Sequence, residues 1–232
     1  MGDANNANKA KYVLELSGVM KEYDGETILA GCDLRLRPGD FVAVVGESGC
    51  GKSTLLSVAG LLLSPSAGSV LVEGVNMAGA PDAEASAERA RAFGFVFQHT
   101  QLIGSLRAID NVLVPACFGA ADMGAAAARA VELVERLGIA HRANHFPHQL
   151  SVGQKRRVAL ARALVLDPLA IIADEPTNDL DEPNADAVAA ILREYAESGH
   201  AVLVATHDVR LAAAAGRVLR LEDGRLTEER SA

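Results

Sequence analysis

The chain of 232 residues contains no tryptophan, and aromatic residues make up only 4% of it. Hydrophobic residues nevertheless account for 50% of the sequence, so the core has to be built from aliphatic side chains, chiefly alanine, valine and leucine. A core of this kind is typical of helices that pack on a parallel sheet. The length suffices for one large domain with a well-developed core.

Cysteine and long hydrophobic runs are also scarce. Cys32, Cys50 and Cys117 are odd in number, widely spaced and without metal-ligand spacing, which predicts free thiols in a reducing cytoplasm. No apolar run approaches the roughly 18 residues that a membrane-spanning helix needs. The polar residues 1–11 lack the hydrophobic centre of a signal peptide and are interpreted as a flexible tail. A membrane role would therefore have to come through a partner.

Positive charge is in deficit. Lysine and arginine number 22 against 30 aspartate and glutamate residues, which gives a formal net charge of -8. A surface of this charge repels phosphate backbones, so we expect no nucleic-acid partner.

Short apolar segments alternate with helical patterns along the chain. Residues 41–45, 92–98, 169–174 and 201–207 are strand-like, and residues 52–63, 125–139, 151–167 and 185–198 are helical in pattern. This alternation predicts an α/β fold with a parallel sheet. A block of helices over 99–159 is expected to form a subdomain inserted into a core of residues 12–98 and 160–228. A closing hairpin is expected around Asp223 and Gly224, followed by a short tail over 229–232.

The segment "GESGCGKST" satisfies the phosphate-loop pattern G-x-x-x-x-G-K-[ST]. Its glycines let successive backbone N–H groups face one anion, and the helix that follows adds the positive end of its dipole. Lys52 is expected to contact the β- and γ-phosphates, Ser53 to hold Mg²⁺, and Thr54 to contact the α-phosphate. The predicted nucleotide-binding residues are Gly46, Glu47, Ser48, Gly49, Cys50, Gly51, Lys52, Ser53 and Thr54. This loop alone does not separate a kinase from a GTPase or an ATPase.

Polar residues at the ends of three other strands complete the expected site, because ligands bind at the carboxyl ends of parallel strands. Asp174 is expected to hold Mg²⁺ and Glu175 to act as the base that activates water. Gln98 is suited to bind metal and water, and His207 to hydrogen-bond the γ-phosphate. Tyr23 is a candidate for stacking on the base of the nucleotide, and a half-buried strand tyrosine is the alternative interpretation.

Three histidines, His141, His145 and His148, lie close together in "HRANHFPH". Pro147 interrupts any helix there, and no cysteine or carboxylate completes a ligand set, so we do not predict a zinc site.

Five segments resemble, in order and approximate spacing, the ATP-binding subunits of ABC transporters: "GESGCGKST", "FVFQ", "LSVGQKRRVALARAL", "LAIIADEPTNDLD" and "VLVATHD". The resemblance extends from about Tyr12 to Leu226. It implies a P-loop NTPase core of the RecA-like type with a mostly parallel sheet, an antiparallel β subdomain and an inserted α-helical subdomain.

The resemblance also implies a role for each motif. Gly46–Thr54 corresponds to Walker A, Gln98 to the Q-loop, Asp174 to the Walker B aspartate and Glu175 to the catalytic glutamate. Asp181 matches the D-loop, His207 the switch histidine and Tyr23 the aromatic residue beside the base. Two such subunits are expected to pair head to tail, with each ATP and its Mg²⁺ held between Walker A of one copy and the signature of the other. The signature residues are Leu150, Ser151, Val152, Gly153 and Gln154.

The signature has a physical interpretation of its own. Ser151 and Gln154 have the spacing of a capping box, which predicts a helix that begins at this point and offers free N–H groups to an anion. Val152 stands where relatives carry the first glycine of Leu-Ser-Gly-Gly-Gln. A β-branched residue resists positive φ, so either the backbone there has ordinary angles or the site is altered.

The segment after Gln98, "GFVFQHTQLIGSLRAIDNVLVPA", resembles the lipoprotein-releasing and macrolide-exporting group. The sequence stops soon after the expected closing hairpin, which favours the same group over importer ATPases with a regulatory domain. We therefore expect a cytoplasmic ATPase attached to the inner face of the membrane, with its helical subdomain contacting permease subunits. Short importer ATPases and a cell-division type regulator remain alternatives. The acidic charge and the absence of a long coiled-coil insertion disfavour a soluble ABC ATPase that acts on DNA or ribosomes.

Overall fold

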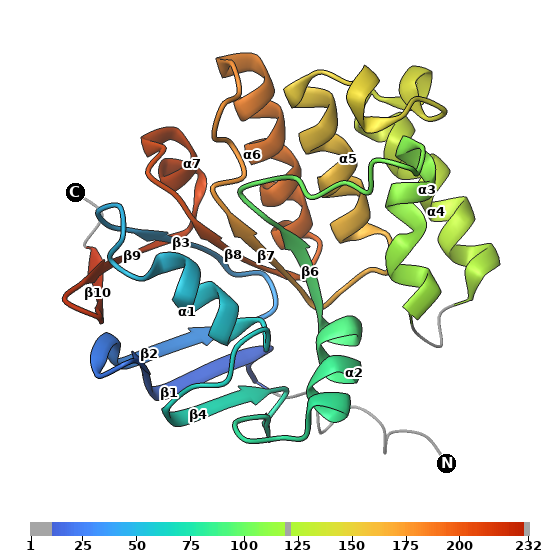
Figure 1. Ribbon diagram of the computed structural model, residues 1–232. Helices are drawn as coiled ribbons and strands as arrows, with labels where there is room; N and C mark the ends of the chain where they lie inside the picture. Colours follow the sequence, from blue (N-terminus) through green and yellow to red (C-terminus); the bar gives the residue numbers. More distant parts are fainter. Residues whose placement is uncertain (1–10, 119–121, 230–232) are drawn as a thin grey trace, which may run out of the picture.

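The computed structural model describes residues 11–118 and 122–229. A six-stranded sheet forms its centre, with helices on one face and a helix and a second sheet on the other (Figure 1). The strand order is β10-β9-β3-β8-β7-β6, and all neighbours are parallel except β10, which pairs antiparallel with β9. The strands are β3 (Phe41–Val45), β6 (Phe93–Val96), β7 (Ala170–Asp174), β8 (Ala201–Ala205), β9 (Arg217–Glu222) and β10 (Arg225–Glu229). The predicted α/β class with a mostly parallel sheet is confirmed.

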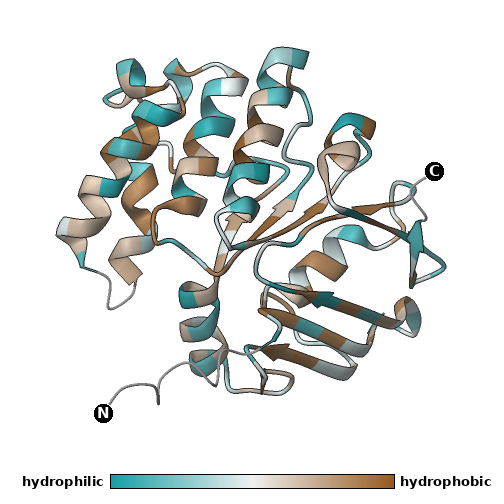
Figure 2. Ribbon diagram, turned by 180° about the vertical axis from the view of Figure 1, so that it is seen from behind, coloured by the Kyte–Doolittle hydropathy of each residue, from teal (hydrophilic) through white to brown (hydrophobic). Residues whose placement is uncertain are grey.

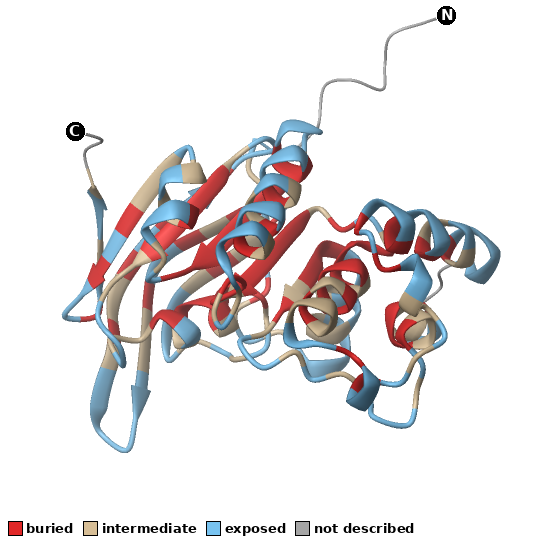
Figure 3. Cartoon of the chain, turned by 90° about the horizontal axis from the view of Figure 1, so that it is seen from above, coloured by how far each residue is buried: buried red, intermediate tan, exposed pale blue. Residues whose placement is uncertain are grey.

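The central strands are apolar throughout because both of their faces are covered. Alternate side chains enter two separate cores, as the period of two in a strand requires: Ala43 and Val202 enter one, Val42 and Leu203 the other. Figure 3 shows these strands buried, with exposed residues gathered on the outer helices and loops.

The second sheet is antiparallel, with the order β2-β1-β4-β5. It consists of β1 (Leu14–Tyr23), β2 (Glu26–Leu36), β4 (Ala67–Val72) and β5 (Val75–Asn76). Alternate leucines and valines of β1, β2 and β4 pack with α1 (Lys52–Ala59) against the large sheet. Figure 2 shows the resulting bands of hydrophobic and hydrophilic residues along these strands.

The opposite face of the large sheet is covered by α5 (Val152–Leu164), α6 (Glu182–Glu197) and α7 (Val209–Ala214). Outside α5 lie α3 (Ala108–Leu113), the 3₁₀ helix η1 (Val114–Phe118) and α4 (Met123–Arg136). Two further 3₁₀ helices, η2 (Ala140–Arg142) and η3 (Pro147–Gln149), precede α5. The domain limit that the sequence places between residues 159 and 160 falls inside α5, which is one continuous helix.

Several boundaries differ from the sequence-based expectations. The strands β6 and β8 end two residues before Gln98 and His207, which therefore lie on the loops that follow them. Two helices, α2 (Asp82–Ala92) and α7, lie outside the helical ranges expected from the sequence. The closing hairpin is present as β9 and β10, but Glu229 belongs to β10 and not to a tail. The remaining tail predictions, 1–10 and 230–232, lie outside the described residues.

Gly94 in β6 marks a close approach between the sheet and α5. A Cβ at this position would lie 2.1 Å from the carbonyl oxygen of Ala163 and 2.7 Å from Ile171 Cδ1. The helix would have to move away from the sheet to admit it. We predict that Gly94→Ala lowers the free energy of unfolding by about 2 kcal/mol or more, measured by urea denaturation. Gly104→Ala is the matched control, because a Cβ there meets no atom within 4 Å; equal stability of the two variants would contradict the close approach.

Candidate active site

The phosphate loop connects the end of β3 to the start of α1, the geometry that the motif requires. At Gly46 a Cβ would lie 2.5 Å from the carbonyl oxygen of Leu221, so no side chain fits there. Gly51 caps α1 with a left-handed backbone, φ 102°. The first N–H groups of α1 are thereby presented at the loop, where they can bind an anion.

Lys52 is buried and folds back over the loop. Its Nζ donates hydrogen bonds of 2.8 Å to the carbonyl oxygens of Gly46 and Glu47. An ammonium group has three donor positions, so one remains for a further acceptor. The positive charge is therefore fixed in the loop before any phosphate is bound.

A pocket with a volume of about 420 Å³ lies against this loop. It unites residues that are up to 152 positions apart in the sequence, and four separate segments supply them. Its lining residues are Tyr23, Ile28, Ser48, Gly49, Gly51, Lys52, Ser53, Thr54, Gln98, Asp174 and Glu175. The structure thus brings Tyr23, Gln98, Asp174 and Glu175 together with the phosphate loop. Gly46, Glu47 and Cys50 line an adjoining hollow beside β9.

Oxygen ligands for a metal are present at one end of this pocket. Burial raises the pKa of the Asp174 carboxyl; the Ser53 hydroxyl and the charge of Lys52 oppose this shift, and the charge of Glu175 reinforces it. A cation beside Asp174 would favour the ionised carboxylate. Within the described part of the chain, no three histidine, cysteine or acidic residues are grouped as a metal site. A site made of Ser53, Gln98 and Asp174 instead fits Mg²⁺, which takes few carboxylates and shares its remaining positions with phosphate and water.

Glu175 is held in an unusual backbone conformation. Its φ is 46°, a left-handed value that is uncommon for residues other than glycine and typical of functional sites. Its N–H donates to the carbonyl oxygen of Ala205 at 2.9 Å. Its Oε2 accepts from the N–H of His207 at 3.3 Å and lies 2.9 Å from Nδ1 of the His207 ring. The carboxylate is therefore buried and oriented by β8 and the loop after it.

His207 itself does not line the pocket beside the phosphate loop. Its exposed ring lies next to Glu175, and it borders a separate hollow with Thr177, Asn178 and Asp208. The geometry places His207 as the partner of Glu175. Its contact with a γ-phosphate stays a prediction.

The aromatic and apolar end of the pocket is formed by the hairpin of β1 and β2. Tyr23 is 45% exposed there, and the ammonium of Lys21 lies 5.1 Å from the centre of its ring. Ile28, which belongs to none of the sequence motifs, lines the pocket on the same hairpin. Its proximity to Tyr23 in a strand pair was the available signal. Both side chains offer the flat or apolar surface that the base of a nucleotide requires.

The signature residues form the start of α5, as the capping box predicts. Ser151 Oγ accepts from the N–H of Gln154 at 3.2 Å, and Gln154 Oε1 accepts from the N–H of Ser151 at 3.0 Å. Val152 is the first helical residue and does not have a positive φ, so its β-branch is compatible with the backbone. Its side chain is 52% exposed. Among the described residues, no partner is found for the N–H groups of Val152 and Gly153.

These signature residues do not line the pocket at the phosphate loop of the same chain. In Figure 1, α1 lies toward the antiparallel sheet, and α5 lies among the helices on the other face of the large sheet. Asp181 is also outside the pocket; its carboxylate accepts from the N–H of Asn184 at 3.2 Å and caps α6. One chain therefore carries the two halves of the predicted site in different places.

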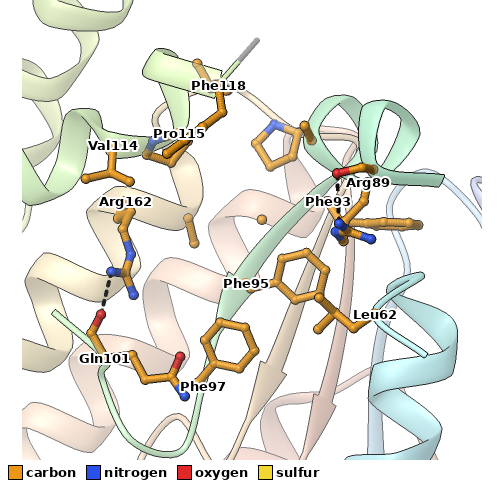
Figure 4. A pocket seen from close by; sticks show the side chains of 16 residues that line it. Leu62, Arg89, Phe93, Phe95, Phe97, Gln101, Val114, Pro115, Phe118 and Arg162 are labelled. Atoms are coloured by element: carbon orange, nitrogen blue, oxygen red, sulfur yellow. Dashed lines mark hydrogen bonds between the residues drawn. The ribbon is translucent and has the colours of Figure 1, made fainter. Parts of the chain in front are cut away.

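A second, largely apolar pocket of about 330 Å³ lies next to the loop that carries Gln98, between α2, β6, η1 and α5 (Figure 4). We refer to it as the apolar pocket behind Gln98. The rings of Phe95 and Phe97 stack inside it with centroids 5.7 Å apart. Arg162 lines one side of it and donates to the carbonyl oxygens of Thr100 and Gln101 at 2.8 and 3.0 Å. Leu62 and Phe118 are exposed at its rim. No motif in the sequence indicates this pocket.

Comparison with known proteins gives consistent matches. A profile of the family described as "ABC transporter" matches residues 29–178. The macrolide export ATP-binding/permease protein MacB 1/2 of Paracoccus denitrificans is 44% identical over 222 residues, which cover 94% of this chain and 33% of that protein. The pyoverdine export ATP-binding/permease protein PvdT of Pseudomonas fluorescens is 42% identical over 222 residues, with 94% and 34% covered. The chain thus spans about a third of the length of these relatives.

Solved structures agree along almost the whole chain. The ATP-binding cassette MJ0796, determined as a dimer in a post-hydrolysis state bound to ADP and Pi, superimposes with a TM-score of 0.87 at 36% identity. The match covers 94% of this chain and 98% of that chain. The cbiO1 structure from Clostridium perfringens, part of an ABC transporter complex, superimposes with a TM-score of 0.82 at 29% identity.

The position of Lys52 generates a direct prediction. Lys52→Ala removes the only side-chain charge of the phosphate loop that can pair with phosphate, so ATP affinity should fall at least tenfold, since hydrogen bonds to charged groups contribute about 1.5–3 kcal/mol. The change in affinity is measured by equilibrium binding of a fluorescent ATP analogue. Lys11→Ala, an exposed lysine beside Tyr12 and outside the pocket, is the control. Unchanged affinity in Lys52→Ala would exclude the phosphate-loop assignment.

Proposed function

The chain belongs to the ABC transporter family, and on that premise we propose that it is the cassette that binds and hydrolyses ATP to drive a membrane permease. The observation that carries this proposal is the single pocket in which the phosphate loop, Gln98, Asp174 and Glu175 converge. Phosphate-binding, metal-binding and base groups occur there together, which is the set that hydrolysis of a γ-phosphate requires.

Each group has a distinct task in this proposal. The N–H groups of the loop and Lys52 bind the phosphates, while Tyr23 and Ile28 contact the base of the nucleotide. Ser53, Gln98 and Asp174 would hold Mg²⁺, which supplies a positive charge that neutralises the phosphate oxygens. Glu175 accepts the proton of the attacking water, and His207 keeps the carboxylate oriented.

A second copy of the chain completes each site. The start of α5 presents the free N–H groups of Val152 and Gly153 together with Ser151, and such a helix start binds anions. It lies away from the phosphate loop of its own chain, so a head-to-tail pair would unite the two halves around two ATP molecules. The dimeric form of MJ0796 bound to ADP and Pi supports this arrangement. Loss of the γ-phosphate would then weaken the pair and turn hydrolysis into movement.

The membrane partner is proposed to dock at the apolar pocket behind Gln98. This pocket has an exposed apolar rim, and Phe97 joins its lining directly to Gln98 in the nucleotide site. A short helix with apolar side chains matches its chemistry. Among the described residues, no helix combines the length and apolar character that spanning a bilayer requires. We propose that permease subunits hold the cassette at the cytoplasmic face of a membrane, because the relatives MacB and PvdT are described as ATP-binding/permease proteins.

Export is the direction that the comparisons favour, because both MacB and PvdT carry the description "export ATP-binding/permease protein". An importer cassette and a regulator that signals without transport are the remaining alternatives. Reconstitution of the cassette with its permease separates them: export predicts ATP-dependent movement of a compound away from the cassette side. Hydrolysis without movement of any compound would instead support the regulator.

The role of Glu175 is tested by Glu175→Gln, which keeps the size and polarity of the side chain but removes the base. Turnover should fall at least 100-fold, because general bases contribute roughly 10²–10⁴-fold, while ATP affinity stays within about twofold. Phosphate release and nucleotide binding are measured on the same preparation. Glu197→Gln, an exposed glutamate at the far end of α6, serves as the control. Wild-type turnover in Glu175→Gln would remove Glu175 from this role.

The docking site is tested by Leu62→Asp, which places a carboxylate at the rim of the apolar pocket. Because burial of an unpaired charge against an apolar partner is strongly unfavourable, the tagged variant should lose its integral membrane partner during purification from native membranes. Val75→Asp, on β5 and also exposed, is the matched control and should retain the partner. Retention of the permease by Leu62→Asp would show that the permease docks at another surface.

A further inference from the structure

Arg156 is a buried arginine whose side chain lies between two loops of the site. It occupies the second turn of α5 and is only 2% exposed. Its guanidinium donates one hydrogen bond of 2.8 Å to the carbonyl oxygen of Phe97 and another of 3.3 Å to that of Asn178. One side chain thus connects two segments that are 81 positions apart in the sequence.

Both acceptors are adjacent to residues of the site. The carbonyl of Phe97 belongs to the peptide bond that leads into Gln98. Asn178 closes a turn on Glu175, because its N–H donates to the Glu175 carbonyl oxygen at 3.2 Å. The next residue, Asp179, has a left-handed φ of 61°. The guanidinium therefore holds the backbone beside Gln98 and the turn that begins at Glu175.

The burial of this charge is unfavourable for stability alone. The guanidinium is held by carbonyl oxygens and not by a carboxylate, and within the described part of the chain its Nε has no hydrogen-bond partner. Burial lowers the pKa of Arg156, and the negative charge of Asp179 only partly opposes this. An apolar side chain of similar length would avoid the desolvation of the charge. A group that is buried at such a cost calls for a role other than packing.

Arg162, on the same helix, holds the other end of the loop that carries Gln98. Its two hydrogen bonds go to the carbonyl oxygens of Thr100 and Gln101. Residues 97–101 are consequently attached to α5 on both sides of Gln98. Arg156 differs from Arg162 because it also reaches the turn after Glu175. A guanidinium suits this task, since its planar fork can donate in two directions at once, whereas an ammonium is a compact point charge.

We infer that Arg156 is a positioning residue that holds Gln98 and Glu175 in register and ties both to the helix whose first residues, Ser151–Gln154, face a second copy. A displacement of either loop by nucleotide is then passed to the start of α5 through one side chain. This inference rests on the proposed hydrolysis of ATP and adds to it a link between the two halves of the site within one chain.

The test compares Arg156→Met, Arg156→Lys and a control, Arg129→Met. Arg129 also binds a carbonyl oxygen of α5, that of Leu164, but at the opposite end of the helix. Arg156 does not line the nucleotide pocket, so the ATP dissociation constant of Arg156→Met should stay within about twofold. Its kcat should fall at least tenfold, because small displacements of reacting groups reduce rates by up to about 100-fold. Arg156→Lys should have an intermediate kcat, and Arg129→Met a kcat within twofold of wild type.

A purely structural role gives a different pattern: a lower Tm for Arg156→Met with kcat and ATP affinity both within twofold of wild type. That result would overturn the inference. Failure of the proposed function is distinguishable, because it appears as a wild-type chain that neither binds nor hydrolyses ATP.

Hydrogen exchange supplies a second readout that does not depend on turnover. In Arg156→Met, amides of residues 97–101 and 177–181 should exchange at least fivefold faster than in wild type, while those in the middle of α6 stay unchanged. Unaltered exchange in both loops would contradict the inference even if the chain alone hydrolyses ATP too slowly to measure.

Discussion

The parallel pairing of four short apolar strands is the constraint on which the whole site depends. In the register of β3, β8 and β7, Val44 pairs with Ala205, and Ala205 with Asp174. Val96 of β6 pairs with Ala173 on the other side. The carboxyl ends of all four strands therefore lie at one edge of the sheet, and the loops that leave them meet there. A change of one residue in this register would turn every inward side chain to the other face.

The loops at this edge contain conformations that an isolated peptide would not keep. Glu175 and Asp179 have left-handed backbones, Gly46 tolerates no Cβ, and Arg156 is a buried cation. Such features persist only where the surroundings fix them. Here the surroundings are two apolar cores, one on each face of the large sheet, built almost entirely from alanine, valine, leucine and isoleucine. The stable part of the molecule thus supports a site whose geometry is unfavourable by itself.

The helix α5 connects the two parts of the site. Its first residues present N–H groups on one side of the molecule, and Arg156 and Arg162 in its body hold the loop around Gln98. The same helix lies against β6 at Gly94, where the backbone of Ala163 leaves no room for a methyl group. A rigid contact at that point makes α5 suitable for transmitting movement, since it cannot shift relative to the sheet without disturbing the loops at its end.

Much of this arrangement could be predicted from the sequence, and the rest depends on contacts that leave no local pattern. The phosphate loop has fixed spacing, the capping box of Ser151 and Gln154 is a local hydrogen-bond pattern, and Asp174 follows an uninterrupted apolar strand. The direction of Arg156 could not be predicted, because an arginine at a helix position normally points to solvent. The same holds for the left-handed backbone of Glu175, which tertiary packing determines. Of the two possibilities for Val152, an ordinary backbone or an altered site, the structure has the first, because helical angles at the start of α5 suit a β-branched residue.

We propose that one chain holds two half-sites and that ATP joins two chains. Native mass spectrometry of Glu175→Gln in the presence of ATP and Mg²⁺ tests it most directly, because slow turnover preserves the bound state. We expect a species of two chains with two ATP molecules, which is absent when nucleotide is withheld. A single chain with one tightly bound ATP, at protein concentrations well above those that support hydrolysis, would contradict it.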